Sequence, residues 1–229
     1  RYTQFLADDG GILDDLMVTR LPGEPERLFI VCNAAMKAQD FALMRAKLPD
    51  LTLDILEDKA LVAVQGPKAV EVVEGLIPGV QNLVFMQGRE FEWRDSPVFV
   101  TRSGYTGEDG YEISLPASQA ESFCERLLSH PDCKPIGLGA RDSLRLEAGL
   151  CLYGHDIDTT TDPIEAALAW SIGKRRRENG GFPGAARIQK ALKDGPARQR
   201  IGLVLDGKQP AREGAEIATP DGKVVGKIT

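Results

Sequence analysis

The sequence predicts an α+β fold, and three observations support this class. Upstream of Arg200, apolar runs with the pattern of antiparallel hairpins alternate with segments of helical periodicity. From Arg200 onward the chain changes to short strand-like runs separated by Gly and Pro turns. No internal repeat and no low-complexity tract interrupts the pattern. At 229 residues the chain exceeds the usual length of one domain, so we expect two compact units, or one large unit and a further piece.

The strands are predicted from short apolar runs next to turn residues. Gly10-Gly11 precedes a run that ends at Val18, and a matching run follows the Pro22-Gly23 break, which together predict a hairpin. The later runs follow the same rule. In order, the predicted strands after the first are Arg27–Cys32, Thr52–Leu56, Ala60–Gln65, Pro97–Val100, Tyr111–Leu115, Ile201–Leu205, Glu216–Ile217 and Lys223–Ile228.

The helices are predicted from start signals followed by apolar residues at helical spacing. The predicted helices are Ala34–Leu48 after the cap Asn33, Pro67–Leu76, a segment with Phe123, Leu127 and Leu128 after the capping box Ser118-x-x-Glu121, and Ala140–Leu150. A further helix is predicted after Asp162-Pro163, with Glu165 in its first turn. Lys174–Arg177 would lie near the end of that helix, where cations are favourable.

Two segments place carboxylates, arginines and tyrosines beside glycines: Ser103–Ser114 and Gly137–Glu147. In the first, three glycines fall where a hairpin has to turn, and Glu112 begins the return strand. A carboxylate accepts two parallel N–H bonds, an aromatic ring covers a face, and an arginine binds another polar edge. The pattern therefore suits a planar ligand with adjacent N–H donors, such as a pterin. Taken alone, the motif is more typical of a glycine-rich hairpin with a solvated acidic tip.

Composition and motifs exclude several functions. The net charge of −6, from 28 basic and 34 acidic residues, argues against binding nucleic acid or an anionic membrane, and no apolar run is long enough to span a bilayer. The four cysteines have no C-x-x-C spacing and the chain has two histidines, which favours reduced thiols over a metal site. Nucleotide-binding and hydrolase motifs are also absent from the sequence.

Five segments together resemble the T-protein family, the aminomethyltransferases of the glycine cleavage system. These segments are Tyr2–Val18, Gln65–Lys68, Arg102–Ser114, Gly137–Gly154 and Thr161–Arg177. The motif Gly-Tyr-Thr-Gly-Glu-Asp-Gly also occurs in related families, but the order, spacing and extent of the segments are similar to the T-protein. The resemblance implies a folate-binding cloverleaf of three domains around a central pocket, without a metal.

The resemblance also implies a domain organisation. Residues 1–56 with 157–196 would form one folate-binding lobe, residues 57–156 a second α+β lobe, and residues 197–229 the beginning of an incomplete C-terminal β barrel. The chain starts at Arg1 without a methionine or targeting segment and stops inside a predicted strand. We therefore expect a fragment that lacks both ends, including a C-terminal arginine that contributes to folate binding in the family.

The family's chemistry implies the substrates and the compartment. Tetrahydrofolate would be the co-substrate, and the other substrate would be the aminomethyl group carried on the lipoyl arm of the H-protein. The products would be methylene-tetrahydrofolate, ammonia and dihydrolipoyl H-protein. The implied partner is lipoylated H-protein, with no nucleic acid or membrane partner, and the implied location is the bacterial cytoplasm or the mitochondrial matrix.

The site residues follow from matching the family's motifs. Asp15 would be the catalytic residue, because a nearby anion stabilises the cationic character of the carbon in transit. The electrostatic role is preferred to proton abstraction, since an ordinary aspartate is a weak base near neutrality. Glu112 and Arg141 would bind the pterin. Tyr105, Tyr2 and Asn33 match positions that line the family's pocket. Without the resemblance, Asp15 would be interpreted as a turn residue bonded to its own backbone.

Two other functions share this architecture. One is the folate-binding portion of a dimethylglycine or sarcosine oxidising enzyme, which carries a flavin domain upstream. The other is a non-catalytic folate-dependent factor of iron–sulfur assembly, recognised by a motif K-G-C-[YF]-x-G-Q-E that is absent here. The pair Asp14-Asp15 and the segment Gly173–Arg177 are more similar to the T-protein. Lys174–Arg177 is also a candidate docking site for an acidic partner such as the H-protein, beside its interpretation as helix-end charge.

Overall fold

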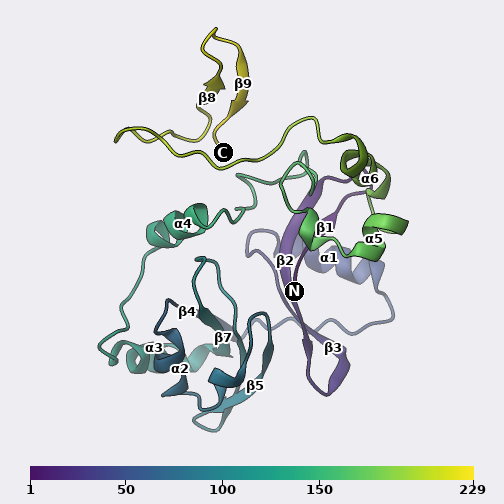
Figure 1. Cartoon of the computed structure of the whole chain (residues 1–229). Helices are drawn as coiled ribbons and strands as arrows, with labels where there is room; N and C mark the ends of the chain where they lie inside the picture. Colours follow the sequence, from purple (N-terminus) through teal and green to yellow (C-terminus); the bar gives the residue numbers. More distant parts are fainter. The chain divides into compact units, whose positions relative to one another are not determined.

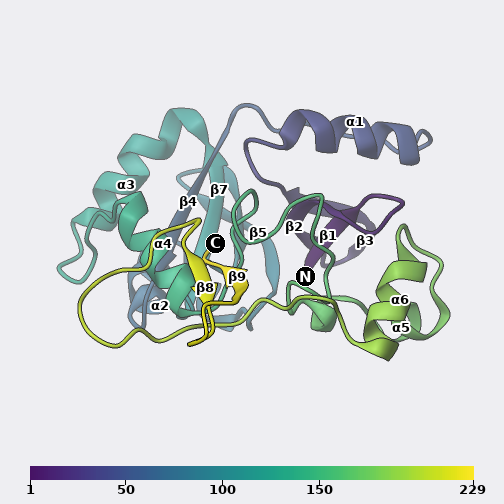
Figure 2. The ribbon, with the colours of Figure 1, turned by 90° about the horizontal axis from the view of Figure 1, so that it is seen from above.

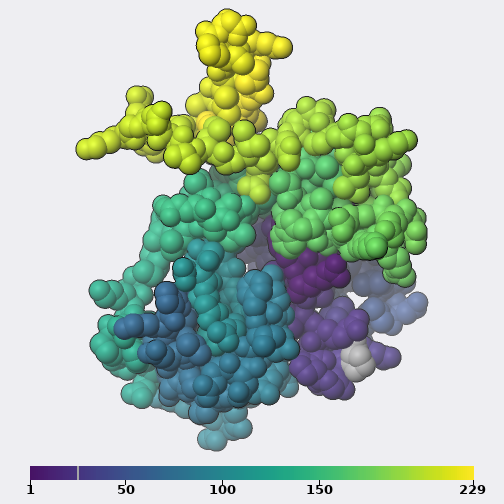
Figure 3. All heavy atoms as spheres, viewed as in Figure 1, coloured from purple at the N-terminus to yellow at the C-terminus, as the bar shows by residue number. Residues whose placement is uncertain are grey.

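The computed structural model describes residues 1–24 and 26–229 (Figure 3). Antiparallel strand pairs and helices together confirm the α+β class. The chain divides into two compact units, of which unit 1 comprises residues 1–3 and 16–150 and unit 2 comprises residues 4–15 and 151–229. The division into three family-like lobes remains a prediction.

The strands form three sheets (Figure 1). The first has the order β1-β2-β3, with β1 Tyr2–Leu6, β2 Ile12–Leu21 and β3 Glu24–Val31. The second has the order β4-β7-β6-β5, with β4 Lys59–Gln65, β5 Gly88–Trp93, β6 Ser96–Thr101 and β7 Gly110–Pro116. The third pairs β8 Glu216–Ala218 with β9 Val224–Lys227. The sequence analysis predicted most of these strands but missed β1 and β5.

Six α-helices and three short 3-10 helices complete the described elements. The α-helices are α1 Lys37–Lys47, α2 Ala69–Glu74, α3 Ala120–Leu128, α4 Leu138–Glu147, α5 Lys174–Asn179 and α6 Ala185–Asp194; the 3-10 helices are Val80–Asn82, Ala117–Gln119 and Ala169–Ser171. In unit 2, α5 and α6 lie side by side (Figure 2). The sequence analysis missed α6. Among residues 1–24 and 26–229, no helix has both the length and the apolar composition needed to cross a bilayer.

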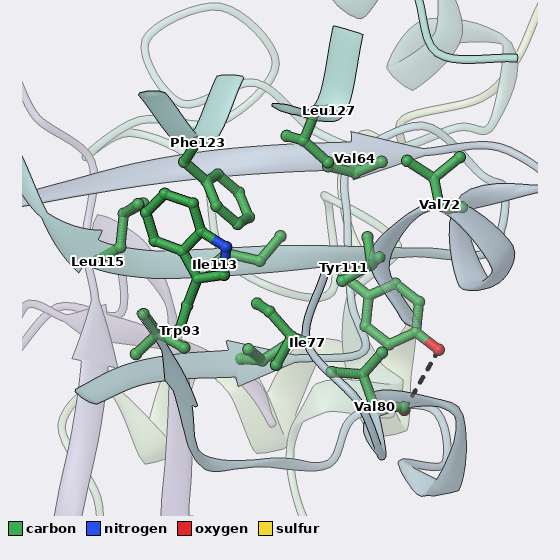
Figure 4. Packing of buried hydrophobic residues seen from close by; sticks show 14 of the residues in the cluster. Val64, Val72, Ile77, Val80, Trp93, Tyr111, Ile113, Leu115, Phe123 and Leu127 are labelled. Atoms are coloured by element: carbon green, nitrogen blue, oxygen red, sulfur yellow. Dashed lines mark hydrogen bonds between the residues drawn. The ribbon is translucent and has the colours of Figure 1, made fainter. Parts of the chain in front are cut away.

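The core of unit 1 lies between the four-stranded sheet and the helices α2 and α3 (Figures 1 and 4). Alternate residues of β7, namely Tyr111, Ile113 and Leu115, are fully buried, as expected when every second side chain of a strand faces the same side. The rings of Trp93 and Phe123 pack edge to face with their centroids 5.0 Å apart. The strands β6 and β7 are therefore anchored in a packed core, and the loop between them is held at both ends.

Two predicted helix starts are wrong. Asn33 does not cap α1, because the helix begins at Lys37; the C=O of Asn33 instead accepts a hydrogen bond from the N–H of Met36 at 2.9 Å. Ser118 does not form a capping box either, because it lies in a 3-10 helix and the N-cap position of α3 is Gln119. In both cases a tight turn comes first and delays the first α-helical turn, which a start signal read from the sequence does not reveal.

The predicted helix after Asp162 forms only its first turn. Oδ1 of Asp162 accepts hydrogen bonds from the N–H groups of Ile164 and Glu165 at 2.8 and 3.0 Å, and Oε2 of Glu165 accepts one from the N–H of Asp162 at 3.2 Å. The predicted capping interactions are therefore present. Ala167 then adopts a left-handed φ of 60°, so the backbone leaves the helical path. A new helix, α5, starts at Lys174, and the basic cluster begins a helix instead of ending one.

Two predicted strands are also wrong. Residues 52–56 and 201–205 have no strand structure. Neither run pairs with another described strand, and Val204 is fully exposed. An apolar run forms a stable strand only where a partner satisfies its backbone groups and covers one face.

Candidate functional site

Two predicted site residues belong to the hairpin of β6 and β7: Tyr105 lies in its loop and Glu112 lies in β7. The register of these strands pairs Thr101 with Glu112, so the two side chains lie on the same face of the sheet. The neighbours of Glu112, Tyr111 and Ile113, point into the core, and Glu112 therefore points to the opposite face. There it is half-buried.

A short chain of hydroxyl groups holds the carboxylate of Glu112. The Oγ of Ser103 donates a hydrogen bond to Oε2 of Glu112 at 2.8 Å, and Ser103 is only 4% exposed. Oγ1 of Thr101 lies 2.7 Å from the same Oγ. Because Ser103 donates its single hydroxyl proton to Glu112, Thr101 must be the donor in this second bond. No described residue donates to Oε1 of Glu112, which remains as an acceptor.

Glu112 lines a cavity within unit 1. The cavity is small, because its enclosed space has room for about one water-sized molecule. The lining side chains are Met17, Thr19, Phe29, Val31, Met86, Thr101, Ser103 and Glu112. Gly88 makes room for the Thr101 side chain, because a Cβ at Gly88 would lie 2.6 Å from its methyl group. Most of these side chains are apolar, and the polar groups among them are one carboxylate and three hydroxyls.

The structure also brings Tyr105 and Arg141 together. The guanidinium carbon of Arg141, on α4, lies 4.9 Å from the centroid of the Tyr105 ring, within the range of a cation–π interaction. Tyr105 belongs to the same loop as Ser103 and is half-buried, whereas Arg141 is exposed. The arginine therefore keeps N–H groups available to a ligand while its flat face rests on the ring.

A bidentate ion pair closes the base of the loop. Nε and Nη2 of Arg102 donate to the two carboxylate oxygens of Asp109 at 2.9 and 2.6 Å. This hydrogen bonding lowers the pKa of the Asp109 carboxyl. The pair joins the two ends of the loop next to the strands, which restricts the movement of the residues between them.

The remaining predicted site residues lie on the first sheet or next to it. Tyr2 begins β1 and Asn33 follows β3, both in unit 1 and both half-buried. Asp15 lies in β2, in the part of that strand that belongs to unit 2. Its neighbour Asp14 is completely buried and Asp15 is half-buried, as the alternation of a strand requires. Of the two carboxylates, Asp15 is the one that a ligand can reach.

The strand that carries Asp15 begins beside a turn of unit 2, and Arg187 donates to the C=O of Thr160 in that turn at 3.2 Å. The N–H of Ile12 donates to the C=O groups of Asp158 and Thr161 at 3.2 and 3.0 Å. Nε of Arg187 lies 2.9 Å from Oδ2 of Asp162, whose side chain is 3% exposed. The sequence analysis did not identify Arg187 as a partner of Asp162. The two residues are 25 positions apart, and no local pattern around a single arginine on an unpredicted helix indicates such a contact.

Ser103 and Thr101 were also missed as individual residues. Ser103 lies inside the stretch that the sequence analysis singled out, but its contact with Glu112 depends on the pairing of β6 with β7. Among residues 1–24 and 26–229, no three His, Cys, Asp or Glu side chains gather in a group that could hold a metal ion.

Comparison with known proteins identifies the family of this fold and site. The model of the GCVT N-terminal domain matches residues 1–176. The chain is 44% identical over 230 residues to the probable mitochondrial aminomethyltransferase of Schizosaccharomyces pombe, covering 98% of this chain and 58% of that protein. It is also 44% identical over 234 residues to the mitochondrial aminomethyltransferase of Homo sapiens, covering 98% of this chain and 57% of that protein.

A solved structure agrees with the sequence matches. The crystal structure of glycine cleavage system aminomethyltransferase T from Bartonella henselae superposes with a TM-score of 0.90 at 43% sequence identity. The match covers 99% of this chain and 62% of that one, so the chain spans about three fifths of the length of the relatives it matches. The chain therefore shares the backbone fold of that protein, in addition to the order of segments from which the resemblance was inferred. The chain belongs to the glycine cleavage T-protein family.

Proposed function

We propose that the protein containing this chain is the aminomethyltransferase of the glycine cleavage system, with tetrahydrofolate as co-substrate and lipoylated H-protein as partner. The observation that carries the proposal is the Glu112 carboxylate, held by Ser103 at the wall of an apolar cavity. Family membership and the names of the relatives, which are aminomethyltransferases, support the same function. The relatives named here are mitochondrial or bacterial, which supports a matrix or bacterial cytoplasmic location.

The proposed reaction moves one carbon. The aminomethyl carbon is bonded to a lipoyl sulfur and to an amine nitrogen, and both bonds break as two bonds to folate nitrogens form. The two protons displaced from the folate nitrogens end on the lipoyl sulfur and on the departing amine, which leaves as ammonia. Because the carbon passes through cationic character, an anion close to it stabilises the transition state more strongly in a dry pocket than in water.

The side chains of the site suit separate parts of this reaction. Glu112 would accept hydrogen bonds from adjacent N–H groups of the pterin, with Oε1 as the acceptor that no described residue uses. Tyr105 and Arg141 would cover a face and bind a polar edge of the ligand. Tyr2 and Asn33 are proposed as secondary contacts. Asp15, half-buried beside a completely buried aspartate, would supply the anion near the transferred carbon.

Replacement of Asp15 tests the proposed chemistry. In the natural full-length protein, Asp15→Asn should leave tetrahydrofolate affinity within about twofold and lower the turnover of aminomethyl transfer at least about 100-fold, because shape is kept and only the charge is lost. Affinity is measured by titration calorimetry, and turnover by the ammonia released from aminomethyl-lipoyl H-protein. Asp8→Asn, an exposed aspartate before the same glycine turn, is the control and should leave both values unchanged.

Three outcomes separate the elements of the proposal. Turnover of Asp15→Asn close to that of the wild-type protein would remove the catalytic role of Asp15. Loss of folate affinity in the same variant would make Asp15 a binding residue instead. If the wild-type protein binds tetrahydrofolate but releases no ammonia, the aminomethyltransferase function itself is wrong.

A further inference from the structure

The side-chain amide of Gln65, the last residue of β4, bridges the loop between β6 and β7. Its Nε2 donates to the C=O of Ser103 at 3.0 Å and lies 3.4 Å from the C=O of Tyr111. Its Oε1 accepts a hydrogen bond from the hydroxyl of Thr106 at 3.0 Å. One half-buried side chain therefore contacts both ends of the loop and a residue between them.

Two glycines of the loop leave the space that Gln65 occupies. A Cβ at Gly104 would lie 1.8 Å from Oε1 of Gln65, and a Cβ at Gly110 would lie 2.4 Å from its Nε2. Neither glycine has a left-handed φ, whereas Gly107 between them does. Gly104 and Gly110 are therefore needed for space and not for an unusual backbone conformation. The fit is consistent with an amide that is built into the loop and not merely adjacent to it.

Ser103 connects the Gln65 amide to the carboxylate of Glu112. Its C=O is held by Gln65, and its Oγ donates to Oε2 of Glu112. Its hydroxyl also accepts from Thr101, and such a chain of donors polarises each successive hydrogen bond. A carboxylate held in this way keeps one orientation before a ligand arrives, so that binding does not have to order it.

We propose that Gln65 and Ser103 are positioning residues for Glu112, in which Ser103 orients the carboxylate and Gln65 fixes Ser103. The inference rests on the proposed folate-binding role of Glu112. It explains why the segment Gln65–Lys68, far from the loop in sequence, accompanies the loop motif: the last residue of β4 is a structural part of the binding loop. Replacement of either residue would therefore change ligand affinity indirectly, through the orientation of Glu112.

A double-mutant cycle in the natural full-length protein tests this coupling. Ser103→Ala and Gln65→Leu should each weaken tetrahydrofolate affinity about 10-fold, the loss expected for one hydrogen bond that supports a charged group. In the Glu112→Ala background, the same two substitutions should change affinity less than about twofold, because the group they position is gone. Kinetically, each should raise KM for tetrahydrofolate and leave kcat at saturating folate unchanged.

Controls separate positioning from general damage. Ser122→Ala removes a half-buried hydroxyl of unit 1 that bonds to the C=O of Gln119, outside the loop, and should leave affinity unchanged. Every variant should unfold cooperatively. A second readout needs no ligand: in protein labelled with ¹³C, the carboxyl signal of Glu112 should shift in both Ser103→Ala and Gln65→Leu, and stay in place in Ser122→Ala.

The outcomes distinguish this inference from the proposed function. If Glu112→Ala weakens binding while Ser103→Ala does not, or if the losses add fully in the double variants, the positioning role is wrong and the folate site stands. If the wild-type protein binds no reduced folate, the proposed function is wrong, and the ligand-free carboxyl signal decides the positioning role. An unshifted Glu112 signal in both variants overturns it.

Discussion

Glu112 shows how much a single position depends on its surroundings. In the sequence it is one of 34 acidic residues. In the structure, the alternation of β7 directs it away from the core, and the Ser103 hydroxyl binds one of its oxygens. The residue type was therefore predictable as a ligand candidate, whereas its hydrogen-bond partner comes from the loop after β6.

Truncation of Glu112 measures its proposed role. Glu112→Ala should weaken tetrahydrofolate binding by about 2–3 kcal/mol, because the N–H donors of the pterin would lose a charged acceptor and remain buried. Titration calorimetry gives the affinity. Glu108→Ala, an exposed glutamate of the same loop, is the matched control and should bind as the wild-type protein does. Equal affinities for both variants would refute the assignment of Glu112.

Gly11 is needed because its backbone approaches another segment closely. A Cβ at this position would lie 1.9 Å from the carbonyl oxygen of Thr159. Gly11→Ala should therefore destabilise the protein by more than about 2 kcal/mol, since the contact atom is backbone and cannot swing away. Urea unfolding measures this. Gly139→Ala, in α4 with no atom within 4 Å of the added methyl, should be neutral or stabilising. A Gly11→Ala variant as stable as Gly139→Ala would contradict the clash.

At the level of elements, strands were predicted better than helix boundaries. The hairpin of β6 and β7 was predicted because two apolar runs flank a glycine-rich turn. The helix expected after Asp162 was not formed beyond its capping turn, because Ala167 takes a left-handed conformation. Turn chemistry and periodicity are local properties, but the length of a helix depends on what its faces pack against.

The core beneath the hairpin gives a prediction for α3. Phe123 is completely buried and packs edge to face on Trp93, so Phe123→Ala should lower the free energy of unfolding by about 3–5 kcal/mol. Leu128→Ala, on the same helix but 45% exposed, should cost less than about 1.5 kcal/mol. Urea denaturation of both variants is the measurement. Similar losses in the two variants would show that the face of α3 is wrongly assigned.

For the whole molecule, carboxyl groups with a lowered pKa predict how stability depends on pH. Hydrogen bonding from Arg102 lowers the pKa of Asp109, and hydrogen bonds from the backbone N–H groups of Gln81 and Gly79 lower that of Glu74. Because these folded-state values lie below the unfolded ones, the stabilisation is fully present above about pH 5 and is lost as the pH falls through the folded-state values.

This acid dependence is testable through Asp109. Asp109→Asn should lower the free energy of unfolding at pH 7 by about 1 kcal/mol, since the pair with Arg102 is partly exposed, with side-chain exposures of 35% and 24%. The difference from the wild-type protein should shrink below pH 4. Urea unfolding at pH 7, 5 and 3 provides the comparison. A difference that stays constant from pH 7 to pH 3 would exclude Asp109 as a source of the acid dependence.

The sequence alone determined the α+β class and the hairpin with its glycine-rich loop, because side-chain periodicity and turn residues are written along the chain. The candidate residues Asp15, Glu112 and Arg141 came from the resemblance of its motifs to the T-protein family. Only the tertiary structure showed that Gln65, 38 residues before Ser103, donates a hydrogen bond to the C=O of Ser103 and that the hydroxyl of Ser103 donates one to Glu112. Such contacts form between strands that come together on folding, so no local pattern encodes them.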